Sequence, residues 1–327
     1  MINTAIIGSG IGLKHLEAID CYRSAKVKII CEKNKNRASL LKKQFPKIRV
    51  INNDDEIFKD KSIKLVSIAS YDNYHYNQIL KCIKNNKHII VEKPFCLSFK
   101  ELKNIYSLLK KKKDIKFVSN LVLRTNDLFK NIKKITNKDK IYYIEADYIW
   151  GRKEKLSGWR SKIKNYSATL GAGIHLIDLI IWILNKKPHS VISFGNKIAT
   201  KKSKFKKNSF VINLFKFPGD IIVKITSNLA GNYQHFHEVK IFEENQTIIH
   251  NLNGSFIINK KKQKKTLKGR YPDKINRKNL IHNFIDQIKD TSITPILTLK
   301  EQVDLMTVCF YADRSLKSNK EIKIKYL

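Results

Sequence analysis

Short apolar runs alternate with amphipathic stretches over the first 120 residues of the chain. The apolar runs are rich in β-branched residues and the stretches between them have helical length, a pattern typical of a parallel sheet built from βαβ units. The predicted strands are Ile2–Ile7, Val27–Cys31, Arg49–Ile51, Leu65–Ala69, His88–Val91 and Lys116–Ser119, with helices near residues 13–21, 35–44, 73–86 and 98–112. We therefore predict one doubly wound α/β domain over residues 1–120.

Beyond residue 120 the apolar runs become longer and alternate with polar residues, which favours antiparallel strands. The predicted strands are Ile141–Trp150, Ser190–Ile198, Ser209–Phe217, Asp220–Ser227, His237–Phe242 and Thr247–Asn251, with helices near residues 173–185, 276–290 and 299–317. These elements predict a second, α+β domain over residues 121–327 with a largely antiparallel open sheet.

A glycine-rich turn, Gly8-Ser9-Gly10-Ile11-Gly12, follows the first predicted strand and opens a helix. Such a turn lets the backbone approach a pyrophosphate, whose charge is met by the helix N-terminus. The third glycine comes one residue earlier than in Gly-x-Gly-x-x-Gly, and a plain strand-to-helix turn would also explain one glycine. The position after a first strand favours a Rossmann-type dinucleotide-binding domain.

A carboxylate, Glu32, ends the second predicted strand about 20 residues beyond the glycines, where it can bind the ribose hydroxyls of the cofactor. A carboxylate repels a 2′-phosphate, so Glu32 favours NAD over NADP. The nearby Lys33 and Lys35 oppose this preference and keep NADP possible, and an exposed glutamate without a ligand is the alternative.

The fifth predicted strand ends in Glu92-Lys93-Pro94. In doubly wound folds the carboxyl ends of the strands line the ligand crevice. An ammonium group there can polarise a hydroxyl or carbonyl oxygen and exchange a proton with it. Lys93 is therefore a candidate catalytic residue.

Three features together resemble the Gfo/Idh/MocA family of oxidoreductases, named after glucose-fructose oxidoreductase and inositol dehydrogenase. They are the glycine turn ending in His15, the Val-Glu-Lys-Pro sequence at 91–94, and Gly-Ala-Gly-Ile-His-Leu-Ile-Asp-Leu at 171–179. The segment 69–75 is similar to a cofactor-contacting loop of that family, with Tyr71 where the family usually has proline. With the pattern of elements, the resemblance extends over essentially the whole chain.

The resemblance implies roles for individual residues. Lys93 and His175 would be catalytic, and Asp178 would lie one turn beyond His175. Many members have a catalytic aspartate four residues before this histidine, where this chain has Gly171. Either Lys93 and His175 suffice, or another residue replaces the carboxylate. The implied cofactor-binding residues are Gly8, Ser9, Gly10, Ile11, Gly12, Glu32, Ser70, His75, Glu92 and Lys93.

Arginine and aromatic residues precede the helix that carries His175. Arginine binds phosphate bidentately, and aromatic faces pack on sugar rings. For Trp159, structural packing is an equal alternative. The candidate substrate-binding residues are Lys93, Arg124, Arg152, Trp159, Arg160, His175 and Asp178, in a stretch similar to family members associated with surface polysaccharide biosynthesis.

The formal net charge of +37, from 65 basic and 28 acidic residues in 327, would ordinarily suggest nucleic acid. Here the excess is dominated by lysine spread along the whole chain, so we expect no nucleic-acid partner. A positive field still favours an anionic cofactor or a sugar nucleotide.

No uninterrupted apolar run approaches the roughly 20 residues that span a bilayer. The first residues predict a strand rather than a signal peptide, and we expect a cytoplasmic protein without a membrane partner. The five cysteines contain no Cys-x-x-Cys pair, so neither a disulfide framework nor a metal site is expected.

The sequence thus predicts hydride transfer between NAD(P) and a hydroxyl-bearing carbon of a sugar, sugar nucleotide or polyol. Two alternatives stay open: an NAD-dependent glycosidase of the same family, and a non-catalytic nucleotide-binding sensor. The resemblance further implies a homodimer or homotetramer.

Overall fold

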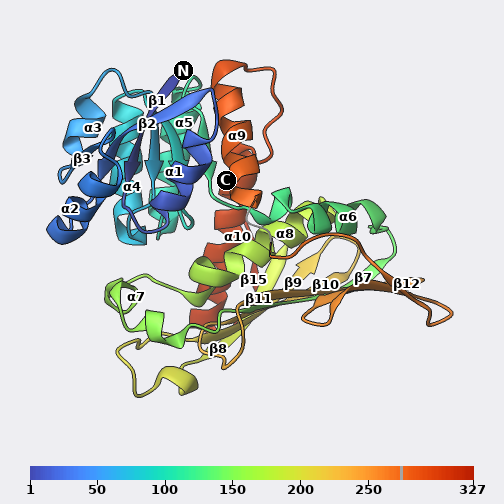
Figure 1. Cartoon of the computed structure of the whole chain (residues 1–327). Coiled ribbons are helices and arrows are strands. Elements are labelled where there is room, and N and C mark those ends of the chain that lie inside the picture. Colours follow the sequence, from blue (N-terminus) through green and yellow to red (C-terminus); the bar gives the residue numbers. More distant parts are fainter. Residues whose placement is uncertain (273–274) are drawn as a thin grey trace. The chain divides into compact units, whose positions relative to one another are not determined.

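The computed structural model describes residues 1–272 and 275–327 (Figure 1), which divide into two compact units. The first unit comprises Met1–Thr125 and a later segment that ends at Val303, and the second comprises the remaining described residues. Helix α9 (Asn276–Lys289), expected in the second domain, therefore groups with the first unit. The reason is packing against α1: the ring of Tyr22 stacks on that of His282 at 4.1 Å.

The first unit contains a six-stranded parallel sheet in the order β3-β2-β1-β4-β5-β6. Its central strands are buried on both faces, as a parallel sheet covered by helices requires. The predicted doubly wound Rossmann fold is confirmed. The strands are β1 (Ile2–Ile7), β2 (Ala25–Cys31), β3 (Arg49–Ile51), β4 (Leu65–Ile68), β5 (His88–Val91) and β6 (Phe117–Ser119).

The helices of this unit follow from local signals in the sequence. In α5 (Phe99–Lys111), for example, Ser98 accepts a capping hydrogen bond from the backbone N–H of Glu101, and the apolar Leu102, Ile105 and Leu109 are buried. The short α3 was not predicted. The other helices are α1 (Gly12–Asp20), α2 (Lys35–Gln44), α3 (Asp55–Lys59), α4 (Asp72–Lys84) and the 3₁₀ turn η1 (Leu123–Thr125).

The second unit contains a nine-stranded sheet in the order β14-β13-β12-β11-β7-β10-β9-β8-β15. Among the described strands of this sheet, only β7 and β10 pair in parallel. The other neighbours are antiparallel, which confirms the predicted largely antiparallel sheet. The strands are β7 (Ile141–Ile149), β8 (Ser190–Asn196), β9 (Phe210–Phe217), β10 (Ile221–Asn228), β11 (Phe236–Glu243), β12 (Gln246–Asn251), β13 (Gly254–Asn259), β14 (Lys264–Thr266) and β15 (Ile322–Lys323).

The apolar helix α8 (Ile174–Leu184) packs against β7, and the preceding π-helical turn η3 (Thr169–Gly173) packs against β10. The remaining helical segments are α6 (Asp127–Ile135), η2 (Lys153–Leu156), α7 (Trp159–Lys162), η4 (Ile198–Thr200) and α10 (Leu299–Ser318), whose first residues belong to the first unit. Within the described part of the chain, no helix combines the length and apolarity that membrane crossing requires.

Candidate active site

The glycine turn after β1 makes close backbone contacts. Gly8 has a φ of +91°, and a Cβ there would lie 2.5 Å from the carbonyl oxygen of Ala69. A Cβ at Gly12 would lie 2.8 Å from a side chain of β1, whereas one at Gly10 would meet nothing within 4 Å. Helix α1 begins here without a side-chain capping bond from Ile11. Its first N–H groups, beside an open glycine, therefore fit a pyrophosphate.

Glu32 is joined to this turn. Its Oε2 accepts a short hydrogen bond from the Ser9 hydroxyl and a 3.3 Å bond from the Ser9 N–H, and its Oε1 accepts from the N–H of Asn34 at 2.9 Å. Burial acts to raise the pKa of the Glu32 carboxyl, but these hydrogen bonds and the nearby Arg37 outweigh it and the pKa is lowered. The carboxylate is therefore ionised and stands beside the turn.

Arg37 is a cation that the sequence reasoning did not single out. Its Nη2 donates to the carbonyl oxygen of Ser9 at 2.9 Å, and its Nε lies 4.0 Å from Oε2 of Glu32. Arg37 is thus a second charged group beside Glu32, the residue expected to distinguish NAD from NADP.

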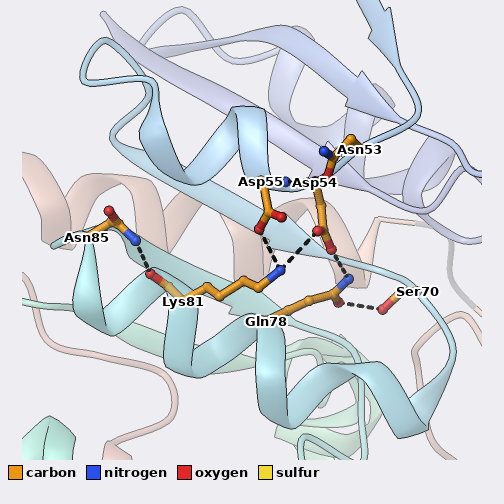
Figure 2. A network of polar contacts seen from close by, with 7 residues as sticks. All are labelled: Asn53, Asp54, Asp55, Ser70, Gln78, Lys81 and Asn85. Carbon is orange, nitrogen blue, oxygen red and sulfur yellow. Dashed lines mark hydrogen bonds and ion pairs between the residues drawn. The ribbon is translucent and has the colours of Figure 1, made fainter.

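Polar contacts fix the loop that follows β4 (Figure 2). The Ser70 hydroxyl donates to Oε1 of Gln78 at 2.6 Å, and the Gln78 amide donates to Asp54 at 2.8 Å. Lys81 binds Asp54 at 3.3 Å and Asp55 at 2.7 Å. Ser70 is therefore held by α4 at the carboxyl end of the sheet.

His75 connects this loop to the chain beyond β5. The side chain is fully buried, with Nδ1 lying 2.8 Å from the carbonyl oxygen of Pro94 and Nε2 lying 3.1 Å from that of Ser70. Because Pro94 directly follows Lys93, His75 helps to set where the lysine's backbone lies. His75 therefore fixes the backbone around the expected cofactor site and does not itself need to contact the cofactor.

A buried polar network surrounds the strand end that carries Lys93. Nε2 of the fully buried His15 lies 3.0 Å from Oε1 of Glu92, and its Nδ1 lies 2.7 Å from the Ser67 hydroxyl. The Asn120 amide donates to the same Glu92 oxygen at 2.6 Å. Burial acts to raise the pKa of Glu92, but the bond and charge of His15 dominate and lower it to about 2. An ionised carboxylate therefore anchors β5 next to Lys93.

In the second unit, His175 lies in the first turn of α8 among aromatic rings. Its ring is parallel to that of Tyr148 at 6.0 Å and lies 5.9 Å from that of His237, which faces Tyr148 across β7 and β11. The His235 ring lies 5.4 Å from Tyr148 and 5.2 Å from His237. We call Tyr148, His175, His235 and His237 the histidine cluster. His237 also makes a short hydrogen bond to the Tyr271 hydroxyl, so the cluster is held by packing and by a polar contact.

Gly171 lies in η3 with the Tyr166 side chain against it. A Cβ at 171 would lie 2.6 Å from Cζ of Tyr166 and closer still to the hydroxyl. The Tyr166 ring is buried and meets the rings of Trp159 at 6.3 Å and Phe205 at 5.8 Å edge-on. The Tyr166 side chain therefore occupies the space that a side chain at position 171 would need.

We expect Gly171→Ala to destabilise the protein by about 1–3 kcal/mol, because the added methyl group would displace a well-packed ring. Urea unfolding would measure the loss. In a Tyr166→Ala background the same substitution should cost clearly less. An equal loss in both backgrounds would show that the contact with Tyr166 is not the cause.

The remaining candidate substrate residues differ in environment. Arg124 is buried and forms an ion pair with Glu301 inside the first unit. The guanidinium of Arg160 stacks on Trp159, with its carbon 4.2 Å from the ring centroid, while Arg152 is exposed. Asp178 is buried in α8. The burial and ion pair of Arg124 suit a structural role.

The structure thus gathers the expected residues into two sets. The cofactor candidates and Lys93 belong to the first unit. The second unit contains His175, whose ring lies beside that of Tyr148, and Arg160, which stacks on Trp159. Sequence reasoning missed Arg37, Tyr148, His235 and His237, whereas Tyr166 was expected among the aromatic residues near the substrate. Of these residues, only Tyr148 could have been predicted to be buried, because it lies on the apolar side of a strand with alternating apolar and polar residues.

The fold and the glycine turn define a chain with an NAD(P)-binding Rossmann domain. Two protein-family models match this chain. Residues 2–120 match the model described as "Oxidoreductase family, NAD-binding Rossmann fold", and residues 139–256 match the GFO/IDH/MocA C-terminal domain. The chain belongs to the Gfo/Idh/MocA family of oxidoreductases, as the sequence resemblance predicted.

One of the curated relatives of this chain has a stated activity. The chain is 28% identical over 167 residues to a scyllo-inositol 2-dehydrogenase (NADP+) of Bacillus subtilis, covering 50% of this chain and 45% of the relative. It spans about half the length of such curated relatives.

Two solved structures share the fold over nearly the whole chain. A scyllo-inositol dehydrogenase of Lactobacillus casei with bound NAD(H) and scyllo-inositol has a TM-score of 0.83 at 16% identity, covering 99% of both chains. The UDP-N-acetylglucosamine 3-dehydrogenase GnnA of Acidithiobacillus ferrooxidans has a TM-score of 0.81 at 13% identity, covering 97% of this chain and 98% of that one.

Proposed function

We propose that the protein is an NAD(P)-dependent dehydrogenase that acts on a hydroxyl-bearing carbon of a sugar, sugar nucleotide or polyol. The observation that carries the proposal is Lys93, which follows β5 at the carboxyl end of the sheet that also carries the glycine turn. Ligands of doubly wound folds bind at this end of the strands. The inositol and sugar-nucleotide activities named for the relatives are consistent with it.

In this proposal the residues divide the work. The turn from Gly8 to Gly12 binds the pyrophosphate, and Glu32 binds the ribose. Lys93 binds the reacting oxygen and exchanges its proton, and His175 orients the substrate. The bound nicotinamide supplies the hydride chemistry.

The direct test is to incubate the protein with NAD or NADP and a panel of polyols, sugars and sugar nucleotides, following NAD(P)H absorbance and the products by chromatography. We expect stoichiometric oxidation of one substrate class. A sugar released without net NAD(P)H would instead favour the glycosidase alternative, and tight cofactor binding with no turnover of any candidate would favour the sensor.

The ionised Glu32 beside the turn predicts tighter binding of NAD(H) than of NADP(H), because a carboxylate repels the 2′-phosphate. Titration by quenching of protein fluorescence would compare the two affinities. Glu32→Ala should narrow the preference without unfolding the protein, since Arg37 then faces the phosphate alone. If the wild-type protein clearly prefers NADP(H), Glu32 does not act in this way.

We also propose that the protein forms a homo-oligomer through the sheet face opposite Tyr148. Ile222, Tyr143 and Phe242 lie side by side across β10, β7 and β11 on that face, and Ile222 is 37% exposed. Such a row favours association between copies. Light scattering after size exclusion would measure the mass in solution.

A further inference from the structure

The guanidinium group of Arg160, in the second unit, lies over two indole rings. Its guanidinium carbon lies 4.2 Å from the centroid of the Trp159 ring and 4.9 Å from that of Trp150. Stacking on indole rings restricts a guanidinium group while leaving its in-plane N–H donors available to an anion. The group is therefore preorganised for a ligand.

Arg160 and Arg152 are cations that no carboxylate of the described residues neutralises at ion-pair distance. By contrast, Arg124 forms an ion pair with Glu301, and Arg49 forms one with Glu56. Two unneutralised guanidinium groups in one region give it a positive potential that an anion would lower.

The segment with Arg152 runs against the segment with His235. Gly151 has a φ of +58°, and a Cβ there would collide with the carbonyl oxygen of Tyr233, two residues before His235. Burial raises the pKa of the Tyr148 hydroxyl, and the charges of both arginines act in the opposite direction. Both guanidinium groups are therefore within electrostatic reach of the histidine cluster.

The histidine cluster adds donors to this region. His175 and His235 are partly exposed and flank the buried Tyr148. Imidazole offers an N–H donor in either tautomer, so the side chains named here are rich in donors and contain no carboxylate. A neutral polyol hydroxyl gains from donors and acceptors alike, whereas a phosphate or carboxylate gains from donors and positive charge.

We propose that Arg152 and Arg160, with the histidine cluster, form a subsite for an anionic group of the substrate, so that the substrate is a sugar bearing a phosphate or a carboxylate rather than a neutral polyol. The inference deepens the proposed function and rests on it, because it takes the substrate to lie against His175. The proposed substrate of this chain is therefore anionic, unlike the neutral inositols of the dehydrogenases that share its fold.

The test measures binding by calorimetry to the full chain saturated with NADH. Glucose 6-phosphate and glucuronate are each compared with glucose, and UDP-N-acetylglucosamine is compared with scyllo-inositol. We expect at least one anionic ligand to bind about tenfold or more tightly than its neutral counterpart, which is the usual strength of charge-assisted hydrogen bonds. The identity of the tightest ligand shows whether the subsite takes a carboxylate, a sugar phosphate or a nucleotide diphosphate. Equal binding of neutral and anionic ligands would overturn the inference.

Variants separate this subsite from the general positive field of the protein. Arg160→Gln should weaken the anionic ligand about tenfold or more and leave a neutral ligand unchanged, and Arg160→Lys should fall between because it keeps the charge but loses the planar stack. The matched control is Arg314→Gln, an exposed arginine of α10, which should have no effect. An equal effect of both glutamine variants would overturn the proposal.

These binding data, taken together with the activity assay on the substrate panel, distinguish the two proposals. Binding of an anionic sugar that depends on Arg160, with no hydride transfer to any compound, would refute the proposed reaction and leave the subsite standing. Oxidation of a neutral inositol that is unchanged in Arg160→Gln would support the reaction and refute the subsite.

Discussion

Replacing Lys93 with methionine should lower kcat by about 10²–10⁴-fold, the usual contribution of a positioned general acid or base. Methionine has a similar length and no proton to exchange, so the loss reports the ammonium group. The affinity for NADH should change little because the glycine turn and Glu32 are intact. Steady-state kinetics with the identified substrate would measure the rate, and fluorescence titration with NADH would show that the cofactor site is formed.

The control for Lys93→Met is Lys113→Met, which changes an exposed lysine of the same unit. Exposed substitutions usually alter stability by less than about 0.5 kcal/mol, so its rate should match the wild type. A folded, NADH-binding Lys93→Met protein with normal kcat would refute the mechanism. His175 would then be the leading candidate for proton transfer.

Glu92→Ala should destabilise the protein by about 3–5 kcal/mol, the usual cost of removing one partner from a buried charged pair. The substitution would leave Nε2 of His15 and the Asn120 amide without their shared acceptor at 3.0 and 2.6 Å. Urea unfolding would measure the loss. Glu17→Ala, which removes an exposed carboxylate paired with Lys14, should cost less than about 0.5 kcal/mol.

The pH dependence of stability gives a second measure of Glu92. Its pKa is lowered in the folded protein to about 2, so the carboxylate stabilises the fold at pH values above its unfolded pKa of about 4.3. This contribution of about 3 kcal/mol is lost as the pH falls from about 4.3 to about 2. Glu92→Gln should flatten the stability profile in that window. An unchanged profile would mean that Glu92 does not carry the acid sensitivity.

Local signals predicted the elements that place the candidate cofactor site. The alternation of apolar strands and amphipathic helices predicted β1 to β6, because hydrophobic periodicity records which face of each element is buried. The glycines after β1 and the position of Glu32 came from the same short-range pattern. By contrast, β13 and β14 were missed because the segment from Gly254 to Thr266 is half-exposed or exposed, and backbone pairing of an edge hairpin needs little apolar surface.

The sequence by itself determined the two sheet types, the glycine turn and the place of Lys93 at a strand end. Only the tertiary structure decided that His15 and Asn120 share the Glu92 oxygen, that Tyr166 lies against Gly171, and that Trp150 and Trp159 hold Arg160. The physical reason is the range of the interactions. Backbone conformation and burial leave a periodic trace over neighbouring residues, whereas a contact between side chains far apart in the chain exists only once packing brings their elements together.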